Sequence, residues 1–321
     1  MTAHLQNNTT TNTIAISVVV PLYNEEATIP ELYTRLTNSI QAITNNYELI
    51  WVNDGSADDT LGQMKKYAAQ DSHIKYISFS RNFGHQSAIS AGIENAIGNA
   101  VVIIDGDLQD PPEVIADLYA KFNEGYHVVY AKRAKRDGET WFKKYTAKTF
   151  YRVLKNITSI DIPVDTGDFR IISKEIKQHL TAMDEKNKFI RGQIAWLGYK
   201  QTFIEYDRHE RQLGETKFTV RKMIRFALDG ITSFSNFPLQ IATFLGFFFS
   251  VIAFLVILYA LYSKFILNEV VNGWTSIMVA TMFLGGVQLL CVGIIGEYIS
   301  RIANDVKKRP SFIIEENNLD N

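Results

Sequence analysis

The sequence predicts an α/β domain built on a mostly parallel sheet, followed by two helices that cross a membrane. Over residues 14–230, short apolar runs rich in β-branched residues alternate with segments of helical periodicity. The strand-like runs are apolar throughout, which is typical of a parallel sheet with helices on both faces. Two long stretches without any charged residue then follow, Ile231–Ser263 and Val270–Gly296.

The alternating elements can be placed in chain order. Strands are predicted for the apolar runs at residues 14–21, 47–54, 74–80, 100–105 and 127–133. Helices are predicted between them, at residues 26–41, 58–70, 85–96 and 112–124. Pro30 and Pro112 suit the first turn of their helices, where a missing N–H costs nothing.

The two uncharged stretches are each long enough to span a bilayer, which takes roughly 20 apolar residues. We predict spans at residues 235–263 and 273–297. A pair of buried helices in a soluble protein is the alternative, but such helices rarely lack a polar face over this length. Basic residues precede the first span and follow the second: Lys217, Arg221, Lys222, Arg225, Arg301, Lys307, Lys308 and Arg309. By the positive-inside rule, the domain at 14–230 and the tail at 298–321 are cytoplasmic, and the protein is a multi-pass protein of the inner membrane.

The remaining composition limits the functional classes. Residues 1–13 form a polar tail without the features of a signal peptide, and one cysteine, Cys291, excludes a disulfide within the chain. A formal net charge of −1 gives no indication of a nucleic-acid partner. Residues 141–158 and 218–234 mix basic and aromatic residues at helical spacing, which favours helices lying at a membrane surface. Helices packed on the domain with a solvated basic face are the alternative.

The segment DGDLQDPP, residues 105–112, places carboxylates directly after the fourth predicted strand. Gly106 lets the backbone turn tightly, so that Asp105 and Asp107 can point at one position, and Gln109 adds a neutral oxygen. Such hard oxygen donors suit Mg²⁺ or Mn²⁺ bridging to substrate phosphates. A solvated loop in which Asp110 caps the following helix is the alternative. Residues 53–56 close the second strand, so both segments should face one crevice beyond the strand ends.

Three segments match in order and spacing the pattern of inverting glycosyltransferases of GT-A fold, which use nucleotide sugars: VVVPLYNEE (18–26), VNDGSADDT (52–60) and IIDGDLQDPPE (103–113). The segments RNFGHQ (81–86), DTGDFR (165–170) and RQLGETKF (211–218) extend the match. With the C-terminal hairpin, the chain resembles the dolichol-phosphate-mannose-synthase-like branch, and within it the GtrB-type bacterial polyprenyl-phosphate glucosyltransferases. The resemblance covers the chain from about residue 14.

The resemblance implies roles for individual residues. Those implied to bind the nucleotide sugar are Pro21, Tyr23, Glu25, Asp54, Asp105, Arg211 and Lys217. Asp105, Asp107 and Gln109 are implied at the divalent cation, and Arg133 and Arg136 at the phosphate of the lipid acceptor. Asp168 occupies the position of the family's catalytic base.

Physical chemistry qualifies some of these roles. A phosphate monoester is already largely a dianion at neutral pH, so we expect Asp168 to orient groups as much as to accept a proton. Arg133 and Arg136 could instead belong to a solvated charge run, and Arg170 could pair with a nearby carboxylate. We expect His85 to be structural rather than catalytic.

The expected function is therefore transfer of one sugar from a nucleotide to a polyprenyl phosphate such as undecaprenyl phosphate, with Mg²⁺ or Mn²⁺. Glucose from UDP-glucose is the leading donor, and GDP-mannose and a UDP-amino-arabinose are the alternatives. A processive polysaccharide synthase would carry a Gln-x-x-Arg-Trp motif and more spans, which the sequence lacks. A membrane tether or a sugar-lipid translocator is the non-enzymatic alternative. Homo-oligomerisation through the hairpin is a further expectation.

Overall fold

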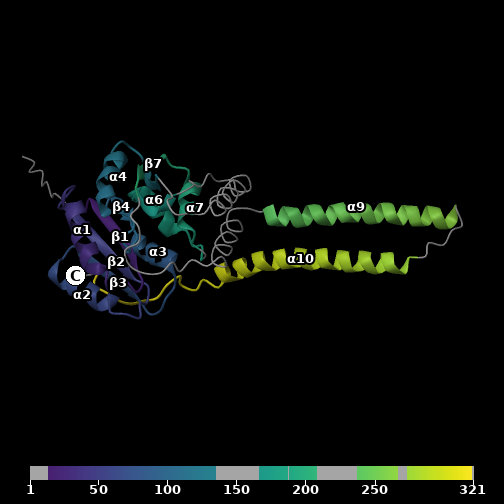
Figure 1. Ribbon diagram of the computed structural model, residues 1–321, viewed down its shortest axis with the longest axis horizontal. Helices are drawn as coiled ribbons and strands as arrows, with labels where there is room; N and C mark the ends of the chain where they lie inside the picture. The colour runs from purple at the N-terminus through teal and green to yellow at the C-terminus, as the bar shows by residue number, and fades with distance from the viewer. Residues whose placement is uncertain (1–13, 135–165, 187, 208–236, 267–272, 320–321) are drawn as a thin grey trace, which may run out of the picture. The chain divides into compact units, whose positions relative to one another are not determined.

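The computed structural model describes residues 14–134, 166–186, 188–207, 237–266 and 273–319. The described residues fall into two compact units, a domain that includes residues 310–319 and a pair of long helices (Figure 1). The tail at 1–13, the proposed surface helices at 141–158 and 218–234, and Arg136, Arg211 and Lys217 lie outside the described residues.

The domain is built on a sheet of eight strands in the order β7-β5-β6-β4-β1-β2-β3-β8. In chain order these are β1 Ile16–Leu22, β2 Tyr47–Asn53, β3 Ile74–Phe79, β4 Ala100–Ile103, β5 Val128–Arg133, β6 Thr166–Ser173, β7 Gln201–Tyr206 and β8 Ile314–Asn317. Strands β4, β1, β2 and β3 are parallel neighbours, as are β5 and β7. The α/β class and the parallel centre of the sheet are thus confirmed, whereas β6 and β8 run antiparallel to their neighbours.

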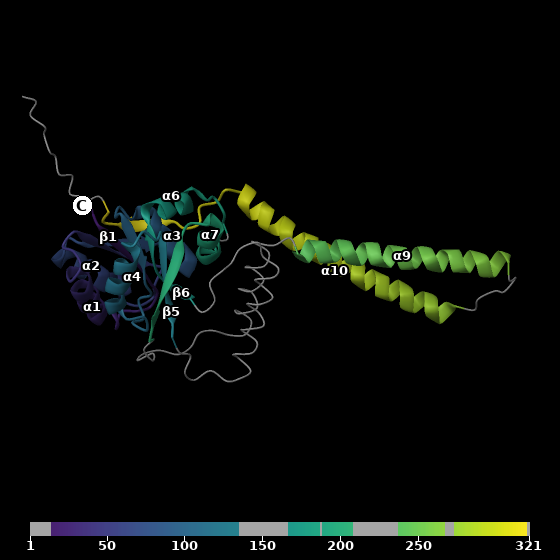
Figure 2. The same ribbon diagram turned by 90° about the horizontal axis from the view of Figure 1, so that it is seen from above.

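Helices cover both faces of the sheet (Figure 2). They are α1 Ile29–Gln41, α2 Thr60–Gln70, α3 His85–Asn95, the 3₁₀ turn η1 Pro112–Val114 that leads into α4 Ile115–Phe122, α6 Lys174–Ala182 and α7 Ile190–Leu197. Because strand side chains alternate between the faces, Val18 and Val20 of β1 pack under α1 and α4, while Val19 packs under α3. This double burial explains why the central strands are apolar throughout.

The second unit consists of α9 Phe237–Phe265 and α10 Trp274–Val306. Within these helices, Phe237–Ser263 and Val279–Val306 are long and apolar enough to cross a membrane, with mean hydropathies of 2.7 and 2.0. The rings of Phe249 and Phe283 lie 5.2 Å apart, and Cys291 Sγ lies 3.8 Å from the carbonyl oxygen of Ala242. The described apolar side chains are otherwise largely exposed, which does not fit a pair of buried soluble helices.

The C-terminal segment does not end as a plain tail. After α10, residues 314–317 pair with β3 as the antiparallel edge strand β8. Ser80 N–H donates to the carbonyl of Ile313 at 3.1 Å, and the ring of Phe312 stacks on Phe79 at 5.0 Å. The residues that follow the hairpin therefore add an edge strand to the sheet of the domain.

Candidate active site at the carboxyl ends of the strands

The loops that follow β1 and β2 are joined by hydrogen bonds between backbone and side chains. Asn24 N–H donates to the hydroxyl of Ser56 at 3.0 Å, and the amide oxygen of Asn24 accepts from Ala57 N–H at 2.8 Å. Glu25 N–H donates to the hydroxyl of Thr60 at 2.9 Å. Asn24 adopts a left-handed backbone with φ +54°, which asparagine tolerates better than most residues. The two loops form one wall beyond the strand ends.

Three residues predicted at the nucleotide lie on this wall or next to it. Pro21 is buried near the end of β1, opposite Val52 of β2. The side chain of Tyr23 is exposed, at 42%, and the carboxylate of Glu25 accepts from the hydroxyl of Thr28 at 3.2 Å. Tyr23 is thus an exposed side chain two residues before the half-buried Glu25.

Asp54, predicted at the base or ribose, is buried and holds the loop before α3. Its carboxylate accepts from the backbone N–H groups of Phe83 at 2.7 Å and Gly84 at 3.0 Å. Burial raises the pKa of Asp54, and these two N–H groups act against that rise. The next residue, Gly55, has φ +64°, and a Cβ there would lie 2.4 Å from the backbone carbon of Arg81. Only glycine allows the two loops to approach so closely.

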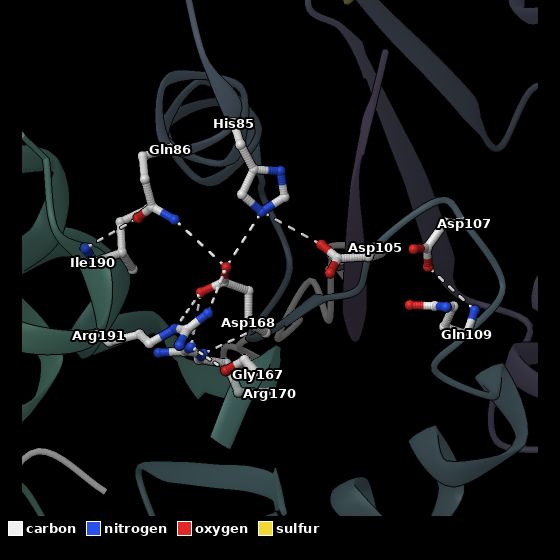
Figure 3. A network of polar contacts seen from close by, with 10 residues as sticks. All are labelled: His85, Gln86, Asp105, Asp107, Gln109, Gly167, Asp168, Arg170, Ile190 and Arg191. Atoms are coloured by element: carbon white, nitrogen blue, oxygen red, sulfur yellow. Dashed lines mark hydrogen bonds and ion pairs between the residues drawn. The ribbon is translucent and has the colours of Figure 1, made fainter. Parts of the chain in front are cut away.

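Asp105 and Asp107, which follow β4, make different contacts (Figure 3). Asp107 accepts from the backbone N–H of Gln109 at 3.2 Å, so these two predicted ligands are neighbours. One carboxylate oxygen of Asp105 is buried without a hydrogen bond and lies 3.4 Å from Nε2 of His85. The pKa of Asp105 is raised to about 6, mainly by burial; His85 acts against the rise, and the carboxylates of Asp168, Asp110 and Asp107 add to it.

The loop after β4 turns at residues 106–107, and a Cβ on Gly106 would lie 2.3 Å from the side chain of Leu22, so the loop packs directly on β1. The position of Asp110 differs from the alternative considered in the sequence analysis. Asp110 neither faces solvent nor caps the following helix: it is fully buried and accepts a hydrogen bond from the hydroxyl of Tyr206. The third carboxylate of the motif therefore lies inside the domain.

Asp168, on β6, receives hydrogen bonds from several side chains (Figure 3). Oδ1 accepts from Arg191 Nε at 2.9 Å and from Arg170 Nη2 at 3.1 Å. Oδ2 accepts from Arg191 Nη2 at 3.1 Å, and it lies 3.2 Å from Nε2 of His85 and 3.5 Å from the amide nitrogen of Gln86. The predicted pairing of Arg170 with a carboxylate is confirmed.

The pairing of β4 with β6 explains how Asp105 and Asp168 come together. Ile103 of β4 lies opposite Arg170 of β6. Asp105 follows Ile103 by two residues and Asp168 precedes Arg170 by two, so both project from the same face of the antiparallel pair. His85, the first residue of α3, lies between the two carboxylates.

The pKa shifts of Asp168 and His85 have opposite directions. Burial alone would raise the pKa of Asp168, but Arg191, His85 and Arg170 hold it well below its usual range. Burial alone would lower the pKa of His85, but Asp105 and Asp168 raise it to about 9. Asp168 is therefore an ionised carboxylate surrounded by cations.

Sequence reasoning missed two members of this cluster, Arg191 and Gln86, and it expected a structural role for His85. The segment that contains Arg191 carries no motif, and only the packing of α7 beside β6 brings its guanidinium to Asp168. Gln86 accepts from the backbone N–H of Ile190 at 3.3 Å and so ties α3 to the start of α7. The segment RNFGHQ, residues 81–86, was the available signal for His85 and Gln86.

Arg133, predicted at the acceptor phosphate, ends β5 beside Gly167 of β6. A Cβ on Gly167 would lie 3.2 Å from Nη2 of Arg133, so the guanidinium passes directly over this glycine. Tyr206, which donates to Asp110, is also hydrogen-bonded by Arg133. The structure thus groups Asp105 and Asp168 around His85, with Asp107 and Gln109 on the loop that follows Asp105, whereas Arg133 lies against Gly167 and Tyr206.

The residues present can be tested for their fit to a divalent cation. Among the described residues, no group of three or more histidine, cysteine, aspartate or glutamate side chains is arranged as a metal site. Mg²⁺ and Mn²⁺, however, commonly bind through one or two carboxylates and complete their coordination with substrate phosphates. Asp105 offers a buried oxygen without a hydrogen bond, and Asp107 and Gln109 offer further oxygens nearby. The donor set fits a cation that arrives with a diphosphate.

Comparison with known proteins identifies the family of the chain. Residues 17–181 match glycosyl transferase family 2, and residues 237–302 match the GtrB C-terminal hairpin. The chain belongs to glycosyl transferase family 2. A Bacillus subtilis relative described as the uncharacterized glycosyltransferase YkcC is 48% identical over 303 residues, which cover 94% of each chain.

Two further members of the family carry more specific names. The Escherichia coli prophage bactoprenol glucosyl transferase homolog is 39% identical over 300 residues, covering 94% of this chain and 98% of the relative. The bactoprenol glucosyl transferase of Shigella phage SfII is 40% identical over 306 residues, covering 95% and 99%. The predicted resemblance to GtrB-type members of the family is confirmed over nearly the whole chain.

Proposed function

We propose that this family 2 glycosyltransferase moves glucose from UDP-glucose to a polyprenyl phosphate, such as undecaprenyl phosphate, at the inner membrane. The main support is that one chain combines a domain of glycosyl transferase family 2 with a GtrB-type hairpin, at about 40% identity to relatives named bactoprenol glucosyl transferase. A lipid acceptor explains why a catalytic domain is joined to two long apolar helices.

The donor nucleotide would lie against the wall formed by the loops after β1 and β2. There the exposed ring of Tyr23 can stack on a base, and Glu25 can accept from ribose or base groups. Asp54 would contribute indirectly, because its carboxylate holds the backbone of Phe83 and Gly84 in place. The remaining residues proposed to bind the nucleotide sugar are Pro21, Asp105, Arg211 and Lys217.

Asp105, Asp107 and Gln109 are the residues that would hold Mg²⁺ or Mn²⁺. When bound, the cation would neutralise negative charge on the departing nucleotide diphosphate. The protein's own contribution is to hold these oxygen donors on a loop packed tightly against β1 through Gly106. Pre-positioned ligands of this kind need no reorganisation during the reaction.

The transfer itself is a single displacement at the anomeric carbon. An oxygen of the acceptor phosphate forms a bond to that carbon while the bond from the carbon to the diphosphate oxygen breaks, and the electron pair leaves with UDP. One displacement inverts the configuration and requires no enzyme nucleophile. Arg133 and Arg136 would attract the anionic acceptor, since a guanidinium binds phosphate oxygens in a bidentate manner.

The membrane arrangement is also a proposal. The basic residues that flank the hairpin favour a catalytic domain and chain termini on the cytoplasmic side, where nucleotide sugars are made. The segments 141–158 and 218–234 would bring the domain to the headgroups. Pairing of two chains through their hairpins is a further expectation.

The proposal is tested with membranes that contain the chain, labelled nucleotide sugars and undecaprenyl phosphate. Label from UDP-glucose should become extractable into chloroform, and chelation by EDTA should abolish this. Asp107→Ala should be inactive, while Asp117→Asn, which neutralises an exposed carboxylate on α4, should keep full activity. Transfer from GDP-mannose or UDP-amino-arabinose, but not from UDP-glucose, would show that the assigned donor is wrong. The absence of transfer from every donor would favour a tether or a translocator.

A further inference from the structure

The hydrogen-bonding capacity of the Asp168 carboxylate is fully used. Each carboxylate oxygen has two lone-pair positions. Oδ1 accepts from Arg191 Nε at 2.9 Å and Arg170 Nη2 at 3.1 Å, and Oδ2 is within 3.1 Å of Arg191 Nη2 and 3.2 Å of His85 Nε2. A general base needs an oxygen that can face the hydroxyl it deprotonates. Asp168, whose side chain is only 7% exposed, offers none.

The side chains of Arg170, Arg191 and His85, which contact Asp168, differ in their exposure to solvent. The side chain of Arg170 is completely buried, and its Nη2 also donates to the carbonyl of Gly167 at 2.7 Å. The side chains of Arg191 and His85 are 24% and 45% exposed. Arg170 is therefore part of the domain interior, whereas Arg191 and His85 form a partly exposed pair of side chains that Asp168 holds in place.

This pair is fixed on its other side as well. The amide nitrogen of Gln86 donates to Asp168 at 3.5 Å. Its amide oxygen accepts from the backbone N–H of Ile190, the residue before Arg191. The starts of α3 and α7 are thereby held together, and so are the side chains of His85 and Arg191 that they carry. A pre-organised pair of this kind loses little conformational entropy when it binds an anion.

The location of the pair indicates which anion it meets. His85 lies 3.4 Å from Asp105, the carboxylate proposed at the donor diphosphate, and 3.2 Å from Asp168. An acceptor phosphate that attacks the anomeric carbon must come close to the donor, and two anions repel unless cations lie between them.

We propose that Asp168 is a positioning anion rather than a general base, and that Arg191 with His85 receives the phosphate monoester of the acceptor. This inference rests on the proposed function, because it assumes a phosphate acceptor. The bond changes are those given above: the phosphate oxygen forms the new bond to the anomeric carbon, the diphosphate leaves, and no proton is transferred to Asp168.

The first test is steady-state kinetics of the full chain with UDP-glucose and undecaprenyl phosphate. Arg191→Gln removes hydrogen bonds to a charged group, so the KM for the acceptor should rise by about 10- to 100-fold. The KM for UDP-glucose should stay within about twofold. Arg191→Lys should be intermediate, because an ammonium keeps the charge without the planar fork. Lys174→Gln, which removes an exposed cation at the start of α6, serves as the control and should match the unmodified chain.

The second test separates positioning from base catalysis by a double-mutant cycle. If Asp168 acts through Arg191, Asp168→Asn should also raise the acceptor KM, and the double variant should be no worse than the more severe single variant. Independent, multiplying effects would overturn the inference, as would a loss of kcat in Asp168→Asn with the acceptor KM unchanged. If Arg191→Gln does not fold, His85→Gln reports on the same pair, and an unchanged acceptor KM there would equally overturn it.

Direct binding of farnesyl phosphate keeps this inference distinct from the proposed function. Calorimetry with the full chain should show binding that weakens about 10-fold or more in Arg191→Gln. Such weakening in a chain that transfers no sugar would refute the proposed function and keep the phosphate site. Equal binding by Arg191→Gln and the unmodified chain, with sugar transfer intact, would refute the phosphate site alone.

Discussion

Asn318 joins the C-terminal segment to strand β3 through its side chain. Its amide oxygen accepts the backbone N–H of Tyr76, and its amide nitrogen donates to the carbonyl of Ile74 at 3.2 Å. Asn318→Ala removes both bonds and leaves two backbone groups of β3 to water. At about 1 kcal/mol for each hydrogen bond, the free energy of unfolding of the domain should fall by about 2 kcal/mol. For a domain of this size, that corresponds to a melting temperature lower by about 4 to 8 °C.

Thermal unfolding of the full chain in detergent, followed by intrinsic fluorescence, measures this change. Asn317→Ala is the matched control, because the side chain of Asn317 makes only a local bond to Leu319 N–H at 3.1 Å. The control should shift the melting temperature by less than about 2 °C. Equal melting temperatures for the two variants would show that β8 does not stabilise the domain, and the placement of the C-terminal strand in the sheet would then be refuted.

Three further changes test other parts of the domain. Residue 55 has a left-handed backbone, and Gly55→Ala forces a Cβ against the backbone of Arg81. The KM for the nucleotide sugar should therefore rise at least about tenfold. An unchanged KM would refute the close contact of the two loops. Tyr206→Phe removes the hydroxyl that donates to buried Asp110 and should lower the free energy of unfolding by about 1 to 3 kcal/mol in chemical denaturation; a change below 0.5 kcal/mol would count against this contact. Glu316→Gln breaks the exposed ion pair with Lys65 and should change the melting temperature by less than about 2 to 4 °C, and a larger fall would show that this pair matters more than exposed pairs usually do.

The sequence was informative where local pattern and burial agree. The β-branched runs of β1, β2 and β4 are buried on both faces, so their composition alone identified them and their common edge. The placement of Asp54 and Asp105 at that edge followed from the same reasoning. The long uncharged stretches likewise predicted α9 and α10, although α10 continues beyond the expected span to Val306.

The strands and contacts that were missed depend on partners far away in the chain. Strand β6 carries Asp168 and Arg170, which are both buried, and charged residues normally argue against a buried strand. Strand β8, IEEN, is short and polar, and it exists only because β3 offers a free edge. The ion pair of Arg191 with Asp168 joins residues 23 positions apart on different elements, which no periodicity encodes.

The central claim is that the carboxylates after β4 hold the donor's diphosphate by means of a divalent cation. Titration of UDP into the purified chain, with and without Mn²⁺, tests it most directly, with the free and bound Mn²⁺ followed by electron paramagnetic resonance. We expect UDP and Mn²⁺ each to bind more tightly in the presence of the other, and this mutual effect to disappear in Asp107→Ala. Equally tight binding of UDP without Mn²⁺, or in the Asp107 variant, would contradict the claim.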